Sequence, residues 1–186
     1  MFVKNNYLSS AIILALAAFT GQANAAPACP SNTSPMTMQG KIFNNAISPG
    51  TTLGTVHLNL GNGSQLKCGI MGSGGIGADG TTINFIHNLV CDDSVSVTTD
   101  TGRTETVHSQ ITLNTSGMSI LQACVPGTPQ AGAYGTFTET SVPIPMSGRG
   151  IFQGVTGGSI ITNGTINCQF AIDMKFQGQI CMPNPH

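Results

Sequence analysis

Apolar and polar residues alternate along much of the chain. From Ile166 to Phe176 every second residue is apolar, and most residues between them are polar. Val56, Leu58 and Leu60 follow the same pattern. Successive side chains of a β-strand point to opposite faces of a sheet, so such segments bury one face and expose the other. The pattern predicts strands around an apolar core.

Turn signals separate these segments. Asn62-Gly63, Asp79-Gly80 and Asn163-Gly164 tolerate the positive φ angles of tight hairpin turns. Asp100-Thr101-Gly102 predicts a further hairpin connection between two short strands. Roughly ten short strands punctuated by turns predict an all-β fold, either a small antiparallel barrel or, as the alternative, a β-sandwich.

Two loops and one weakened strand are also expected. Gly72–Gly80 contains the pattern G-x-G-x-x-G, but a turn and a strand follow it instead of the helix that a dinucleotide site requires. We therefore interpret it as a long hairpin loop, and Cys124–Gly132 as a second loop. Pro143 and Pro145 predict that Ser141–Met146 is an edge or bulged strand, because proline lacks the backbone N–H.

The N-terminal residues predict export. Lys4 precedes an apolar run from Ala11 to Phe19, and Ala23-Asn24-Ala25 matches a cleavage site. The run is shorter than the roughly 20 apolar residues that span a bilayer. We expect residues 1–25 to be a signal peptide, of a kind typical of bacteria.

One domain remains after cleavage. We expect residues 26–36 to form an N-terminal extension and residues 37–186 to form a single β-barrel domain. The mature chain has no second long apolar stretch, so no transmembrane segment is expected. The predicted destination is the periplasm or the extracellular space.

All six cysteines follow the predicted cleavage site. An even number of cysteines in an exported chain predicts disulfides. No Cys or Cys/His spacing typical of a metal site is present, so we expect no bound metal. The cysteines can pair in many ways, and their connectivity stays open: Cys29, Cys68, Cys91, Cys124, Cys168 and Cys181.

Composition excludes some functions. Charged residues make up 7% of the chain, against roughly 25% in ordinary soluble domains. Six Lys and Arg residues are too few to neutralise a phosphate track, so nucleic acid is not an expected partner. No nucleophile elbow, phosphate loop or metalloprotease motif occurs. The chain therefore leans away from an enzyme, and no cofactor is expected.

Candidate chemistry centres on His87. His57 and His108 fall on outward faces, whereas His87 shares an inward face with Ile83 and Leu89. A histidine there is either a hydrogen-bonded core residue or an acid, base or polar anchor in a cavity. If the barrel interior is hollow, the expected lining residues are Phe85, His87, Phe170, Met174 and Phe176.

Ser147–Ser159 contains the pattern G-x-G-I-F-x-G-x-x-G. It resembles the glycine-rich hairpin of the allene oxide cyclase and dirigent β-barrel superfamily. Ala133–Thr138 is similar to the strand before that hairpin. Phe170, Phe176 and Gly178 are similar to the closing aromatic strand of the family.

The resemblance implies an eight-stranded antiparallel barrel with an apolar interior, as in calycins and allene oxide cyclases. Plant members cyclise a fatty-acid epoxide or steer the coupling of phenolic radicals. Their catalytic polar residues have no counterparts at matching positions here, so no catalytic residue is carried over. The six cysteines, the absence of Trp and the low charge depart from the plant pattern.

Three functions follow from these expectations. The first is a binding protein for a small apolar or aromatic ligand, since a small barrel can hold one. The second is a structural or adhesive surface subunit of fimbrial type, which requires an open groove for a partner strand. The third is an allene oxide cyclase-like or dirigent-like activity. The ligand and the oligomeric state stay open.

Overall fold

Strands form where the alternating pattern supplies one apolar face. The computed structural model describes residues 28–99, 101–125 and 132–184, so the predicted signal peptide lies outside the described residues. The elements are β1 (Thr33–Ser48), β2 (Thr51–Leu60), β3 (Gln65–Ile76), β4 (Thr82–Cys91), β5 (Val95–Thr98), β6 (Thr104–Val107), β7 (Gln110–Ala123), β8 (Ala133–Pro143), the short 3-10 helix η2 (Gly150–Phe152), β9 (Gly157–Ile166) and β10 (Ala171–Pro183).

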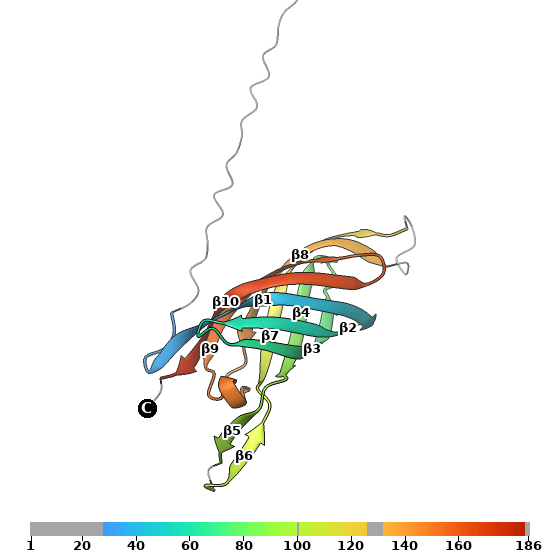
Figure 1. Cartoon of the computed structure of the whole chain (residues 1–186). Coiled ribbons are helices and arrows are strands. Elements are labelled where there is room, and N and C mark those ends of the chain that lie inside the picture. The colour runs from blue at the N-terminus through green and yellow to red at the C-terminus, as the bar shows by residue number, and fades with distance from the viewer. Residues whose placement is uncertain (1–27, 100, 126–131, 185–186) are drawn as a thin grey trace, which may run out of the picture.

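Eight of these strands form a closed antiparallel barrel, with the neighbours in the order β1-β10-β9-β8-β7-β4-β3-β2. β5 and β6 make a separate hairpin that projects from the barrel beside η2 (Figure 1). The expectation of a small antiparallel β-barrel is therefore confirmed.

The barrel has a closed end and an open end. The β5–β6 hairpin, η2 and both ends of the described chain lie at the closed end, and the turns β1–β2 and β3–β4 lie at the other. Phe152 of η2 and Val155 are fully buried and plug the closed end. They pack with the apolar core of that half, which includes Met38, Leu58, Ile70, Ile111, Ile160 and Ile180.

Three disulfides brace the barrel. One ties the segment before β1 to β10, and another joins neighbouring strands β3 and β4; both lie at the closed end. The third links the β7–β8 connection to the β9–β10 turn at the open end. In that order they are Cys29–Cys181, Cys68–Cys91 and Cys124–Cys168. The predicted disulfides are confirmed, and they are typical of an oxidising, exported environment.

The glycine-rich segment after residue 71 is not the long loop that the sequence predicted. Gly72 to Ile76 belongs to β3 and pairs with β4. A Cβ at Gly72 would lie 2.4 Å from Thr52 Oγ1, and a Cβ at Gly74 would lie 2.0 Å from the carbonyl oxygen of Asn84. Glycine occurs here because the strand packs closely against its neighbours.

The long alternating segment near the C-terminus is not a single strand. β9 ends at Ile166, and the Asn167 side chain then accepts hydrogen bonds at 3.0 Å from the backbone N–H groups of Gln169 and Ala171. This turn leads into β10. Ile166 and Ile172 are paired across the hairpin, so they share a face and the alternation runs unbroken through the turn.

Other boundaries also differ from expectation. β1 begins at Thr33 and pairs with β10, so the barrel starts within the expected N-terminal extension. Asn163-Gly164, predicted as a turn, lies inside β9. β8 is flanked on both sides and ends at Pro143, so it is neither an edge strand nor continued to residue 146. Asn62-Gly63 and Asp79-Gly80 do form turns.

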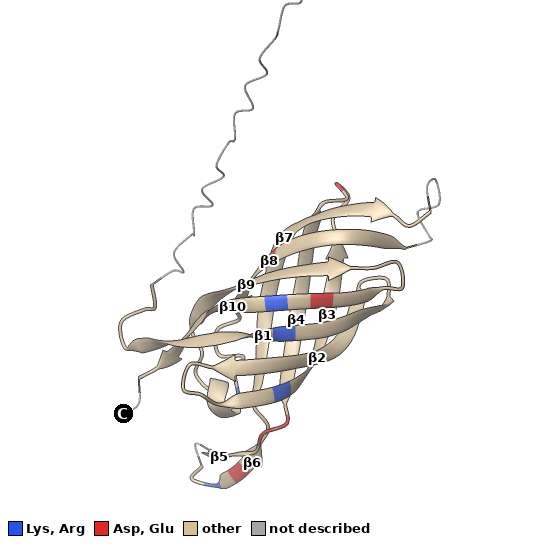
Figure 2. Cartoon of the chain, turned by 45° about the horizontal axis from the view of Figure 1, so that its top comes forward, with Lys and Arg blue, Asp and Glu red and all other residues tan. Residues whose placement is uncertain are grey.

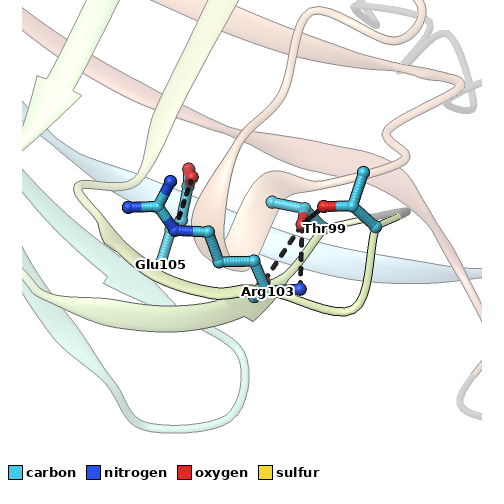
Figure 3. Close-up of polar contacts among 4 residues, drawn as sticks. Thr99, Arg103 and Glu105 are labelled. Atoms are coloured by element: carbon cyan, nitrogen blue, oxygen red, sulfur yellow. Dashed lines mark hydrogen bonds and ion pairs between the residues drawn. The ribbon is translucent and has the colours of Figure 1, made fainter.

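The β5–β6 hairpin ends in a polar tip. Gly102 has a φ of +77°, and the Thr99 hydroxyl donates to the backbone carbonyl of Arg103 at 3.1 Å. Arg103 Nε lies 3.8 Å from Glu105 Oε1 (Figure 3). Both side chains are exposed, so this ion pair contributes little stability. The predicted hairpin is seen, except that Asp100 lies outside the described residues.

Candidate ligand-binding cavity

The open half of the barrel encloses a cavity of about 780 Å³. Small-molecule pockets typically measure about 300–1,000 Å³ and are lined mainly by apolar side chains. This wall is largely apolar, and its side chains come from strands on all sides of the barrel. They include Ile83, Phe85, Leu121, Phe137, Ile172 and Met174.

A layer of buried polar side chains lies between the cavity and the packed half. We call it the polar layer; it consists of Asn44, Thr52, His87, Thr115, Glu139, Ser141 and Thr162. Asn44 Nδ2 donates to Thr52 Oγ1 at 3.0 Å, and the hydroxyls of Thr115 and Ser141 lie 2.8 Å apart. Buried polar groups are costly unless they are hydrogen-bonded, so these contacts offset the burial of the side chains that make them.

His87 lies in this layer on β4 and is 7% exposed. Its Nδ1 lies 3.0 Å from Thr115 Oγ1, and its ring stacks on Phe85 with 5.5 Å between ring centroids. The absence of a side chain at Gly72 leaves room for the ring, since a Cβ there would lie 2.8 Å from it. Burial lowers the pKa of His87 to about 4. The imidazole is therefore neutral at neutral pH.

Glu139 lies in the same layer on β8 and is 6% exposed. Its side chain has no hydrogen bond or ion pair to any described residue. Every fully buried side-chain nitrogen or oxygen of the described residues does have a hydrogen-bond partner, so the Glu139 carboxyl oxygens are not fully buried. The carboxyl oxygens therefore face accessible space, and Glu139 lines both the cavity of about 780 Å³ and a small second cavity of about 30 Å³. Burial raises the pKa of Glu139 to about 7, because the charged form is poorly solvated.

Four of the five predicted lining residues border this cavity: Phe85, His87, Phe170 and Met174. Phe170 reaches it from the β9–β10 turn, with a φ of 64°, and not from a strand. Phe176 is 7% exposed and borders instead a small cavity of about 30 Å³ towards the closed end. His57 and His108 are exposed, as the alternation predicted.

Sequence reasoning missed Glu139, although a signal for it existed. On β8, Phe137, Glu139 and Ser141 occupy alternate positions, and Thr138 and Thr140 between them are exposed. The aromatic ring of Phe137 marks the inward face, so parity alone places Glu139 inside. Sequence reasoning missed this position because a charged residue normally indicates an exposed site.

Among the described residues other than Glu139, charged residues are sparse along the ribbon (Figure 2), and all of them are exposed except the half-buried Asp93. Lys41 and Lys175 are opposite each other on β1 and β10. Every Lys and Arg side chain of the described residues is exposed, so none of them neutralises Glu139. In residues 28–99, 101–125 and 132–184, no group of three or more His, Cys, Asp or Glu side chains is placed to hold a metal ion.

Comparison of the chain with protein-family models, curated proteins and solved structures finds no match. The resemblance to the allene oxide cyclase and dirigent superfamily therefore stays a prediction. Within the described part of the chain, no helix has the length and apolar character needed to cross a bilayer. The interpretation of the site depends on its geometry.

Proposed function

We propose that this protein is an exported, disulfide-stabilised barrel that binds a small, mainly apolar ligand at its open end. The observation that carries the proposal is the cavity of about 780 Å³ above the half of the barrel that holds the apolar core. Protein interiors are otherwise close-packed, and empty apolar space forfeits contacts. A cavity of this size in one half of a barrel is explained by an occupant.

The wall and floor of the cavity suit such an occupant. Apolar side chains would release ordered water as the ligand enters, which drives binding. His87 and Glu139 on the floor would supply the few polar contacts that orient a ligand. The Cys124–Cys168 disulfide ties two connections at the rim together, which would hold the cavity open.

The closure of the barrel favours ligand binding over a fimbrial-type subunit. Every barrel strand already has two hydrogen-bonded neighbours, whereas donor-strand assembly needs a free groove. A cyclase-like or dirigent-like activity is the remaining alternative, and turnover of epoxide or phenolic substrates would test it. The disulfides support export, with the periplasm and the extracellular space as the two destinations.

Titration with N-phenyl-1-naphthylamine, a neutral probe that fluoresces in apolar surroundings, tests the proposal. Ala46 lines the cavity, so Ala46→Phe should fill it and weaken binding by at least about tenfold. Ala171 is exposed on the neighbouring strand β10, opposite the exposed Asn45. Ala171→Phe is therefore the matched control and should bind as the wild type does. Absence of binding, or equal loss in both variants, would contradict the proposal.

A further inference from the structure

Glu139 is the only acidic side chain among the described residues that lines the cavity. It is 6% exposed and has no hydrogen bond or ion pair to any described residue. A carboxylate in an apolar site is costly unless an opposite charge or several donors satisfy it. The folded chain leaves this carboxyl group facing open space, so a bound molecule is the remaining source of a partner.

The surrounding elements supply no cation. Across the sheet, Glu139 is flanked by Gly117 on β7 and Thr162 on β9. The other walls contribute Met174 from β10 and, as the one other titratable group of the cavity, His87 from β4. Every Lys and Arg side chain of the described chain lies outside the barrel wall and is exposed.

We propose that the ligand is an amine: an apolar, preferably aromatic body carrying an ammonium group that pairs with the Glu139 carboxylate on the cavity floor. This proposal rests on the ligand-binding function above. An ammonium group supplies both the missing charge and up to three hydrogen-bond donors. Charge-assisted hydrogen bonds are about twice as strong as neutral ones.

His87 and the aromatic wall are compatible with such a ligand. Burial lowers the pKa of His87 to about 4, so the imidazole is uncharged at neutral pH. It therefore neither forms an ion pair with Glu139 nor repels an ammonium group. Phe85 and Phe137 also line the cavity. Aromatic faces attract cations and accept apolar rings.

The pairing predicts both a ligand preference and a pH dependence. At pH 8 the Glu139 carboxyl, with a pKa of about 7, is mostly ionised and attracts a cation. At pH 6 it is mostly protonated, so an amine must displace that proton to bind. Amine affinity should therefore fall by about tenfold from pH 8 to pH 6. An anionic ligand is repelled at pH 8.

Isothermal titration calorimetry of the mature, disulfide-bonded protein tests this with three probes that share one ring system. These are 1-naphthylmethylamine, 1-naphthalenemethanol and 1-naphthoic acid. At pH 8 we expect the amine to bind about tenfold more tightly than the alcohol, and the acid to bind most weakly. Glu139→Gln should abolish the preference. Glu105→Gln removes the same charge outside the barrel (Figure 3) and should leave it unchanged.

The outcomes separate this inference from the proposed function. If the alcohol binds as tightly as the amine, or if Glu139→Gln keeps the preference, the amine inference is overturned while the cavity still binds ligands. If none of these probes binds and N-phenyl-1-naphthylamine also fails, the binding function itself is overturned. Should Glu139→Gln fail to fold, the wild-type comparison at pH 8 and pH 6 decides: an unchanged amine affinity overturns the inference.

Discussion

Two buried side chains, Glu139 and His87, have pKa values displaced in opposite directions by one cause. Burial disfavours the charged form of either group, so it raises the pKa of Glu139 to about 7 and lowers that of His87 to about 4. The unfolded chain has no such environment, and there the two groups titrate near 4.5 and 6.5. Folding stability therefore depends on pH through both.

Their contributions oppose each other. The folded state holds the Glu139 proton more tightly, so the stability from this group is fully present below pH 4.5 and is lost as the pH rises to about 7. For His87 the stability is present above pH 6.5 and is lost as the pH falls to about 4. In the wild type the two should nearly cancel between pH 4.5 and 6.5.

Glu139→Gln should expose the His87 contribution alone. We expect the free energy of unfolding of this variant to rise by about 3 kcal/mol from pH 4 to pH 6.5. His87→Gln should show the reverse, a fall with rising pH. Urea unfolding at a series of pH values measures both. If the free energy of unfolding changes with pH in the same way in the wild type and both variants, then Glu139 and His87 do not cause the pH dependence.

At the scale of the element, β3 shows how glycine serves packing within a strand. Gly72 faces inward beneath His87 and Thr52, whereas Gly69 on the same strand faces solvent. Both have ordinary backbone angles, so only the space around them differs. This contrast isolates the effect of close packing from glycine's conformational freedom.

Gly72→Ala should destabilise the barrel by about 1–3 kcal/mol, because the added Cβ would lie 2.4 Å from Thr52 Oγ1. Gly69→Ala is the control: its Cβ would have no neighbour nearer than the Val90 carbonyl oxygen at 4.0 Å. Urea midpoints of the two variants should differ accordingly. Equal midpoints would mean that residue 72 lies in a loop, as the sequence first indicated.

At the scale of the whole molecule, the packed core and the cavity occupy different ends of the barrel. The closed end holds the apolar core, the η2 plug and two disulfides. The open end holds the cavity and the remaining disulfide. Because the closed half supplies the packing, the open half can leave space for a ligand.

Intact mass spectrometry of the exported protein tests this arrangement. Under denaturing conditions, the mass should lie six hydrogens below that of the reduced chain without residues 1–25, because each of three disulfides removes two. Under native conditions, a reproducible extra mass would identify a retained ligand. The full thiol mass would contradict the disulfides, and a mass that includes residues 1–25 would contradict cleavage.

The sequence by itself determined the fold class, the inward faces and the presence of disulfides. Alternation places Leu58 and His87 inside and His57 outside, because strand geometry turns each successive side chain to the other face. Such local rules need no knowledge of strand partners. These rules miss the β9–β10 turn, because the alternation continues through it and Ile166 and Ile172 share a face. They also mistake a strand for a loop at Gly72, where glycine is needed for close packing.

Only the tertiary structure decided the strand order, the cysteine pairing and the hollow interior. Cys29 meets Cys181 because β1 and β10 close the barrel, a contact between opposite ends of the described chain. Glu139 lines the cavity without a cation beside it because the strands around it come from several sides of the barrel and offer none. These properties arise from contacts between distant segments, so no local pattern of residues could determine them.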